Sequence, residues 1–347
     1  MFDEMSINPQ VHYDANSDVL KGFSTLGNKN KIADHALTSM VKGIKKNYKQ
    51  PVAYFFTQNL NKIELKKCIK EVIYHVKSTG LKVVATVCDQ SSINVGAIES
   101  LIQDTKENYF RKGKTWRNDL FIVDKSKIIP IFDVPHLFKG IRNNLITKDL
   151  KYIDFDDENK EKTLKWEYFQ QLYDADKSQG ELRYLLKVTE EHINPDKINK
   201  MKVKTATQLL SHSVAVAAKH LTAIGELDPA CRQITPIVKI LDNLFDSLNC
   251  NTFGVVNGKI FRAGVKINSP HHKLWRDSLK FLRNIRFLEK KKDGTKIRLV
   301  EKVVPSVKNF IKTVEGMQAI WEILHKKYSL DTMLCRNFNQ DPDISNR

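Results

Sequence analysis

The chain has 347 residues, of which 41% are hydrophobic and 28% charged, and its formal net charge is +17. This length favours two domains over a single hydrophobic core, and the composition is that of a globular protein rather than a disordered one. No run approaches the ~18 apolar residues of a membrane span, and the acidic first residues lack the apolar region of a signal peptide. We therefore expect an intracellular protein with no membrane partner.

The cysteines also point to the cell interior. They are odd in number and never in a CxxC pair: Cys68, Cys88, Cys231, Cys250 and Cys335. Such a set is typical of reduced thiols, mostly in the core, and not of disulfides or zinc ligands.

The positive charge is concentrated in two segments. Residues 1–145 carry 22 basic and 14 acidic side chains, residues 146–249 carry 15 and 17, and residues 250–330 carry 18 and 6. A basic surface attracts polyanions, with nucleic acid as the first candidate. A generically basic protein without such a partner is the alternative.

The first 145 residues predict alternating strands and helices. Segments rich in β-branched and aromatic residues predict strands, and apolar residues spaced by three and four predict helices. The strands are expected over 1–7, 11–23, 51–57, 81–87 and 128–132, and the helices over 61–78, 94–106 and 137–145. This order is that of an α/β RNase H-like fold, in which helices cover a mixed sheet.

The second half predicts a mainly helical domain. Residues 146–180 begin with a polar, charged stretch that suits a linker or excursion. Helices are expected over 202–221, 235–248, 274–290 and 307–328, with a hairpin or loop over 251–268. Thr235 is placed to cap its helix, with Pro236 in the first turn.

Two aspartates stand where metal chemistry needs them. Asp3 lies in the first predicted strand, and Asp89 ends a later, apolar one. Carboxylates on neighbouring strands repel each other, and Mg²⁺ relieves that repulsion and binds phosphate oxygens. Two such ions ~4 Å apart can activate a water or a 3′-hydroxyl. Turn or cap roles are the alternative for both, and Asp133 is a rival candidate that we interpret first as a helix-start residue.

Other motifs add little. Neither GxxxxGK[ST] nor GxGxxG occurs, nor GxSxG or HExxH, so no Walker, Rossmann, hydrolase or zinc-protease site is predicted. Lys139, Arg142 and the pair Asn143-Asn144 can face DNA phosphates or form a solvated helix face.

Eight segments over nearly the whole chain form a more specific pattern. They are residues 2–7 (FDEMSI), 87–90 (VCDQ), 131–145 (IFDVPHLFKGIRNNL), 192–195 (HINP), 200–203 (KMKV), 208–218, 245–249 (FDSLN) and 339–342 (NQDP). In this order they resemble the P element-type transposase family, which includes the THAP-domain transposases of animals. The segment over 131–145 is the most specific.

The resemblance implies a domain division and a metal site. It implies an RNase H-like catalytic domain over 1–145, a mainly helical GTP-binding insertion domain over 146–337, and a return into the RNase H-like domain over 338–347. Asp3 and Asp89 match the family's first two metal-binding catalytic aspartates, which implies Mg²⁺ as a cofactor.

The resemblance also implies GTP, which in the family helps to assemble transposon ends and is not a fuel. Asp246 and Asn249 match the family's DxxN nucleotide contacts, and a carboxylate can accept guanine N1–H and N2–H together. Asp196 and Lys202 fall where the family has further nucleotide contacts. Asp341 matches an acid at the return into the catalytic domain. An ordinary exposed helix residue is the alternative for Asp246.

The chain departs from the family at the third catalytic acid. The family continues Asn-Gln-Asp-Pro-Leu-Glu-Asn-Phe-Phe, whereas Ile344 stands at the glutamate position here. The adjacent Asp343 would point about 100° away on a helix. The family's zinc-coordinating THAP domain and dimerising helix are also absent from the sequence. We expect a truncated, catalytically incomplete transposase.

The function expected from the family is Mg²⁺-dependent DNA cleavage and strand transfer in the nucleus. Its partners would be DNA (transposon ends in the intact family), GTP and a second copy of the chain. DNA affinity here should be electrostatic and salt-sensitive. The alternative is a domesticated, non-catalytic DNA- or protein-binding factor that keeps the fold and the basic segments.

Overall fold

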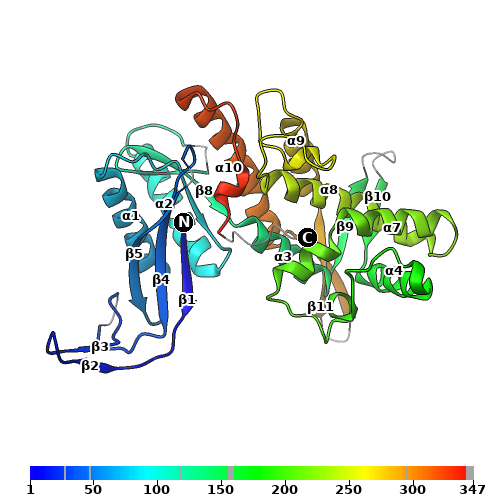
Figure 1. The fold of residues 1–347 in the computed structure, drawn as a ribbon, viewed down its shortest axis with the longest axis horizontal. Helices are drawn as coiled ribbons and strands as arrows, with labels where there is room; N and C mark the ends of the chain where they lie inside the picture. Colours follow the sequence, from blue (N-terminus) through cyan, green and yellow to red (C-terminus); the bar gives the residue numbers. More distant parts are fainter. Residues whose placement is uncertain (27–28, 47, 117–118, 155–159, 294–295, 341–347) are drawn as a thin grey trace. The chain divides into compact units, whose positions relative to one another are not determined.

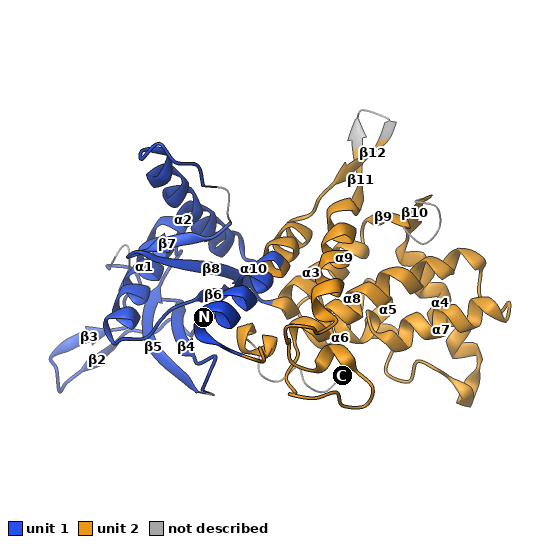
Figure 2. Ribbon diagram, turned by 90° about the horizontal axis from the view of Figure 1, so that it is seen from above, with its two compact units in different colours: residues 1–133, 315–330 blue, residues 134–314, 331–347 orange. Residues whose placement is uncertain are grey.

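The structure is a computed structural model that describes residues 1–347 except 27–28, 47, 117–118, 155–159, 294–295 and 341–347. The chain forms two compact units (Figure 2). Residues 1–133 and 315–330 make the first unit, and residues 134–314 and 331–347 the second.

The strands of the first unit pair in both directions (Figure 1). An antiparallel sheet has the order β1-β4-β5, and a second has the order β6-β8-β7, in which β6 and β8 are parallel. Cα atoms of β1 and β6 lie within 8 Å of one another, so the two sheets meet at these strands. The bounds are β1 (Phe2–Ser6), β2 (His12–Asp14), β3 (Val19–Lys21), β4 (His35–Lys42), β5 (Lys49–Thr57), β6 (Ala85–Cys88), β7 (Phe121–Val123) and β8 (Ser126–Phe132).

Two helices of this unit follow the strands closely in sequence, α1 (Lys62–Ser78) and α2 (Ser92–Phe110). The start of α1 is fixed by a capping box, because the Asn61 side chain accepts the backbone N–H of Glu64 and the Glu64 side chain accepts that of Asn61. Gly80 follows the helix at φ +88°, as the sequence predicts for the residue that ends it.

The last helix, α10 (Pro305–Tyr328), contributes residues 315–328 to the first unit. A Cβ on Gly316 would stand 2.7 Å from Ile131 Cδ1 and 3.1 Å from Ile129 Cγ2, so a glycine lets the helix lie this close to β8. Residues 315–330 thus belong to the same compact unit as the early strands.

The second unit combines helices with a four-stranded antiparallel sheet of order β10-β9-β11-β12. The strands are β9 (Asp149–Asp154), β10 (Lys160–Leu164), β11 (Arg286–Asp293) and β12 (Lys296–Lys302). The helices, besides residues 305–314 of α10, are α3 (Val134–Leu145), α4 (Trp166–Ser178), α5 (Glu190–Ile193), α6 (Val203–Leu209), α7 (His212–Ala223), α8 (Ile234–Leu248) and α9 (His271–Asn284). Four 3₁₀ turns in the described chain are η1 (Gly180–Leu182), η2 (Pro229–Gln233), η3 (Ile260–Arg262) and η4 (Cys335–Phe338).

This sheet corrects two expectations. The polar stretch that suits a linker contains β9 and β10, where Leu150 and Tyr152 point inward on alternate residues. The helix expected over 274–290 ends at Asn284, and the chain turns extended at Ile285 and continues as β11. Pairing with β9 buries Phe287 completely, which outweighs the helical spacing around it.

Two further expectations about helices are wrong. The single helix over 202–221 is broken between α6 and α7, where Leu210 has ψ 42° and Ser211 has ψ 160°. Because Leu210 is fully buried, it continues the apolar pattern and hides the break. Thr235 does not cap α8, since Gln233 precedes the helix and the Thr235 hydroxyl donates to Ala215 O at 3.2 Å.

Helix α8 is held from two sides within its unit. Phe138 of α3 lies edge-on to Phe245, with ring centroids 4.8 Å apart. Trp275 of α9 is fully buried and donates its indole N–H to Ser247 Oγ at 3.0 Å. These contacts fix the C-terminal end of α8, which carries the predicted nucleotide residues.

All five cysteines are free and buried, as their scatter predicts. Cys335 N–H donates to Cys250 Sγ at 3.2 Å in the second unit. Within the described residues, no helix is both long enough and apolar enough to cross a membrane.

Candidate functional site

The predicted metal-binding aspartates lie on neighbouring strands of the first unit. Asp3 is in β1, opposite Thr38 of β4, and its exposed carboxylate accepts the Glu4 N–H at 3.0 Å. Asp89 directly follows β6, which lies beside β1. The Glu4 carboxylate is engaged elsewhere, because it accepts the hydroxyl of Thr57 at 2.9 Å.

The Asp89 carboxylate is oriented by neutral donors. Its Oδ1 accepts the Ser91 N–H at 2.9 Å and the Asn94 side-chain amide at 2.6 Å, both at the start of α2. Among the described residues, no lysine or arginine pairs with Asp89. One oxygen is therefore anchored while the negative charge is left without a protein cation, which suits a divalent ion with oxygen ligands.

Cys88, the last residue of β6, is buried directly before Asp89. Burial raises the pKa of Cys88 well above its usual range, and the charges of Asp89, Asp133 and Asp3 raise this pKa further. The structure places Asp3 in β1, Asp89 directly after the neighbouring β6, and Asp133 directly after β8, which pairs with β6. A metal site shared by Asp3 and Asp89 stays a prediction.

Asp133 occupies the matching position on the neighbouring strand. Cys88 of β6 pairs in parallel with Phe132 of β8, so Asp89 and Asp133 follow paired residues. The Asp133 N–H donates to Cys88 O at 2.8 Å, and its side chain is fully buried. It directly precedes α3, which agrees with the helix-start interpretation. Burial makes Asp133 a poorer ligand for an ion that enters from solvent than either partly exposed acid.

The described part of the chain holds no three-residue metal cluster. There, no group of three or more His, Cys, Asp or Glu side chains is close enough to hold a metal ion. Asp341, Asp343 and Ile344 lie outside the described residues.

The predicted guanine contact Asp246 is a buried, ion-paired carboxylate. It is 7% exposed at the end of α8, so an ordinary exposed helix residue is excluded. Its Oδ1 lies 3.1 Å from Arg262 Nε of η3, and its Oδ2 lies 3.4 Å from Lys259 Nζ. Both oxygens thus face cations, which the sequence did not indicate.

Asn249 stands one turn after Asp246 and contacts a second asparagine. Its amide donates to Phe245 O at 2.8 Å, and its Oδ1 accepts the amide of Asn339. Asn339 is 2% exposed, and its own Oδ1 has no hydrogen-bond partner in the described structure. A buried acceptor without a donor costs free energy, and a nucleotide N–H would satisfy it.

Asp196 and Lys202 are exposed and form separate contacts. The Asp196 N–H donates to Asn194 Oδ1 at 3.1 Å, and Lys202 Nζ lies 3.9 Å from Glu191. No hydrogen bond or ion pair joins either residue to Asp246 in the described chain.

Arg142 corrects the expectation of a phosphate-facing or solvated side chain. It is completely buried, and burial lowers the pKa of its guanidinium to about 10. Its NH2 donates to Asn199 O and its NH1 to Thr205 Oγ1, both at 3.3 Å. Asn143 donates to Lys200 O at 3.1 Å. The segment over 131–145 thus anchors the loop that carries Lys202.

A groove of about 640 Å³ lies along α4 and α5. None of its lining residues is a predicted nucleotide contact: Glu167, Gln170, Gln171, Tyr173, Asp174, Lys177, Glu190, Ile193 and Asn194.

Two family models match the chain where these sites lie. The TNP-like, RNase H N-terminal domain matches residues 1–102, and the TNP-like, GTP-binding insertion domain matches residues 135–259. The chain is a P element transposase homologue that contains both TNP-like domains. This confirms the resemblance on which Asp3, Asp89 and Asp246 were selected.

Relatives of this transposase family match most of the chain. Transposable element P transposase of Drosophila melanogaster is 26% identical over 344 residues, which are 98% of this chain and 40% of that protein. DNA transposase THAP9 of Homo sapiens is 24% identical over 284 residues, 77% of this chain and 29% of that protein. The chain therefore spans less than half the length of either curated relative.

The fold has a solved counterpart. The Drosophila P element transposase strand transfer complex matches with a TM-score of 0.75 and 23% identity, over 98% of this chain and 68% of that one. The fold is thus a transposase RNase H domain with a mixed sheet and an insertion domain, as predicted.

Proposed function

We propose that this chain carries the catalytic and nucleotide-binding parts of a P element-type DNA transposase and acts on DNA in the nucleus. The observation that carries the proposal is that Asp3 lies in β1 and Asp89 directly follows the neighbouring strand β6, in the part that matches the RNase H model. The similarity to two transposases supports DNA as the substrate. Action as a homo-oligomer belongs to the same proposal.

Asp3 and Asp89 would hold Mg²⁺. When bound, the ion supplies activation of the attacking hydroxyl and stabilisation of the leaving phosphodiester oxygen. The protein keeps Asp3 in place through the β1–β4 pairing, and it keeps Asp89 in place through the N–H groups of Ser91 and Asn94. Rigid carboxylates reduce the cost of assembling the metal site.

Asp246 and Asn249 would contact GTP, with Lys202, Asp196 and Asp341 as further contacts. The Asp246 carboxylate suits the guanine edge, and its partners Lys259 and Arg262 bring positive charge to the same place. The orphan acceptor of Asn339 offers one more site for a nucleotide donor. GTP would serve assembly on DNA rather than supply energy.

The domain division belongs to the proposal as well. It has a catalytic part over 1–145, a mainly helical GTP-binding insertion over 146–337, and a return over 338–347. The matches to residues 1–102 and 135–259 and the helices α4 to α9 support this division.

Because Ile344 stands at the family's glutamate position, we propose that strand cleavage by residues 1–347 is weak or absent. The same observation favours a second function, a domesticated DNA- or protein-binding factor without chemistry. Mg²⁺-dependent nicking of a supercoiled plasmid separates the two. Nicking that Asp89→Asn abolishes supports the transposase, and DNA binding without either nicking or GTP binding supports the factor.

The nucleotide site is tested by titration calorimetry of the purified chain with GTP and Mg²⁺. Asp246→Ala is compared with Asp277→Ala, which removes an exposed aspartate from α9 in the same unit. We expect micromolar binding that the first variant loses and the second keeps. A folded chain that binds no GTP, or equal binding by both variants, would exclude the site.

A further inference from the structure

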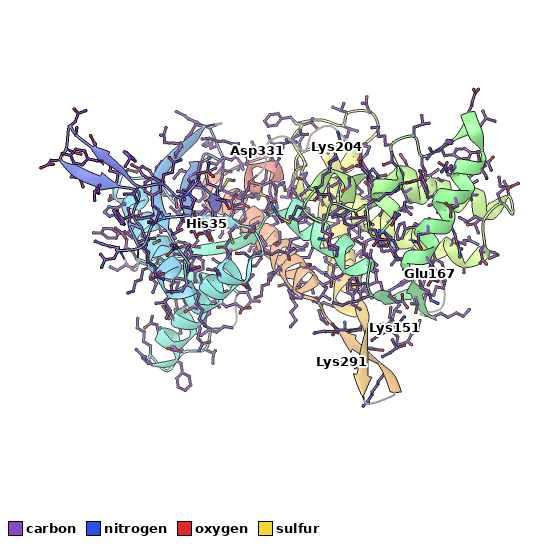
Figure 3. The ribbon with its side chains drawn as sticks, turned by 90° about the horizontal axis from the view of Figure 1, so that it is seen from below. His35, Lys151, Glu167, Lys204, Lys291 and Asp331 are labelled. Atoms are coloured by element: carbon purple, nitrogen blue, oxygen red, sulfur yellow. The ribbon has the colours of Figure 1, made fainter. Side chains whose placement is uncertain are left out.

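Strands β11 and β12 form a hairpin whose charges differ along its length. The hairpin extends away from the helices of the second unit (Figure 2), and Lys291 lies on the part that reaches beyond Lys151 (Figure 3). Close to the helices, β11 also pairs with β9 at residues 286–288, so only that end is supported by a third strand.

The acidic residues near the supported end are neutralised by lysines. Glu289 lies 3.1 Å from Lys302 Nζ and 3.7 Å from Lys148 Nζ. Glu301 lies 2.8 Å from Lys151 Nζ. Charge is therefore balanced where the hairpin meets the sheet.

Among the side chains that the structure describes in the far part of the hairpin, there is no such balance. Lys290, Lys291 and Arg298, which we call the hairpin cations, are all exposed. Within the described residues none of them forms an ion pair. Lys291 and Arg298 are directly opposite each other in the register, and like charges at opposed positions destabilise a strand pair. A polyanion would remove that cost.

The hairpin cations lie on both faces of the two-stranded ribbon. Opposed residues share a face and successive residues alternate, so Lys291 and Arg298 are on one face and Lys290, opposite Leu299, is on the other. A ribbon that lies flat on an anionic surface needs cations on one face only. The DNA major groove, ~12 Å wide, admits a two-stranded ribbon between two walls of phosphates.

We propose that the β11–β12 hairpin enters the major groove of duplex DNA and that Lys290, Lys291 and Arg298 contact phosphates on both sides of that groove. This rests on the proposed DNA substrate and adds the surface that binds it. Because phosphate contacts carry no sequence information, the hairpin positions the chain on DNA without selecting a site.

The test compares two triple variants in duplex-DNA binding over a series of salt concentrations. Lys290→Gln/Lys291→Gln/Arg298→Gln removes the hairpin cations. Lys187→Gln/Lys219→Gln/Lys239→Gln removes three exposed lysines of the same unit that lie outside the hairpin. The slope of log K against log salt is negative, and each lost phosphate contact makes it shallower by ~0.9. We expect the hairpin variant to lose at least ~10-fold in affinity near 0.1 M salt, with a slope shallower by about 2 to 3.

The control variant should keep nearly the wild-type slope, and single-stranded DNA of the same sequence should show a smaller loss than the duplex. Equal losses in both variants would mean that affinity follows net charge alone, which overturns the proposal. An unchanged slope in the hairpin variant overturns the proposal too. If the hairpin variant binds DNA as the wild type does but is no longer retained on polyglutamate, the hairpin binds an acidic protein, and the proposal is again overturned. If the wild-type chain binds no duplex DNA, the proposed substrate itself is wrong.

Discussion

Asp89 and Asp246 represent two opposite ways to hold a functional carboxylate. Among the described residues, Asp89 receives hydrogen bonds from the neutral N–H groups of Ser91 and Asn94 and pairs with no lysine or arginine. Asp246 is paired with Lys259 and Arg262. The first arrangement leaves negative charge for an added cation, whereas the second balances the charge within the protein. Loss of Asp89 therefore leaves no lysine or arginine of the described chain unpaired, whereas loss of Asp246 leaves two cations beside each other.

The largest expected effect comes from removing a side chain that supports the Asp246 site. Trp275→Ala should lower the free energy of unfolding by about 3–5 kcal/mol, because it empties a fully buried position. Since Trp275 also donates to Ser247 of α8, GTP affinity should fall with stability. Urea unfolding measures the free energy of unfolding, and titration calorimetry measures the GTP affinity. Trp275→Phe keeps most of the volume and should lose less; an equal loss in the two variants would contradict the cavity explanation.

A change in the packing of the first unit, which contains Asp89, should lower the free energy of unfolding by less. Gly316→Val places side-chain atoms where a Cβ alone would already be 2.7 Å from Ile131, and such overpacking costs about 1–3 kcal/mol. Gly96→Val is the control within α2, where the nearest atom to an added Cβ is Lys62 Cδ at 3.4 Å. The control should change stability by less than about 0.5 kcal/mol. Equal thermal shifts for both variants would show that α10 is not tightly packed on β8.

The two carboxylates can be compared directly. Asp246→Ala should cost about 1–2 kcal/mol, less than a fully buried pair, because Lys259 and Arg262 have side chains 39% and 33% exposed. Asp89→Asn keeps an Oδ1 acceptor for Ser91 and should cost less than about 0.5 kcal/mol. It should nevertheless abolish Mn²⁺ binding measured by electron paramagnetic resonance. A larger stability loss at Asp89 than at Asp246 would reverse the comparison.

The smallest effect concerns pH in the second unit. Burial lowers the pKa of His271 below the value of about 6.5 that an exposed histidine has. Between these two pKa values the unfolded chain binds more protons, so the stability from neutral His271 is present above pH ~6.5 and is lost as pH falls towards the folded value. In His271→Gln this loss should disappear. The stability difference between wild type and variant should therefore shrink from pH 7.5 to 5.5, and a constant difference would sink the assignment.

Local patterns in the sequence predict much of the fold but miss pairings between distant residues. The capping box of Asn61 and the glycine at residue 80 are local, and α1 is placed almost to the residue. β4 (His35–Lys42) is missed, and β6 begins at Ala85 rather than at residue 81. β11 reads as the end of a helix because its partner β9 lies far away in sequence.

The functional sites could also be predicted only in part, because local sequence patterns do not show contacts between distant residues. Asp3, Asp89 and Asp246 follow from their place in family segments. The buried state of Arg142 and the orphan acceptor of Asn339 depend on tertiary packing, and no sequence period encodes them. The polar character of arginine and its place on a helix suggest solvent, whereas the contacts with Thr205 and Asn199 come from a segment about 60 residues away.

Because all five cysteines are buried, their reactivity with thiol reagents can report local opening of the structure. A thiol-specific reagent cannot reach any of them in the native state, and each becomes modifiable only when the element around it opens. Cys68 and Cys88 report on the unit with the paired acids, and Cys231, Cys250 and Cys335 report on the unit with Asp246. Pulse labelling followed by peptide mass spectrometry can thus rank the local stabilities of the two units in the unaltered sequence, with and without GTP.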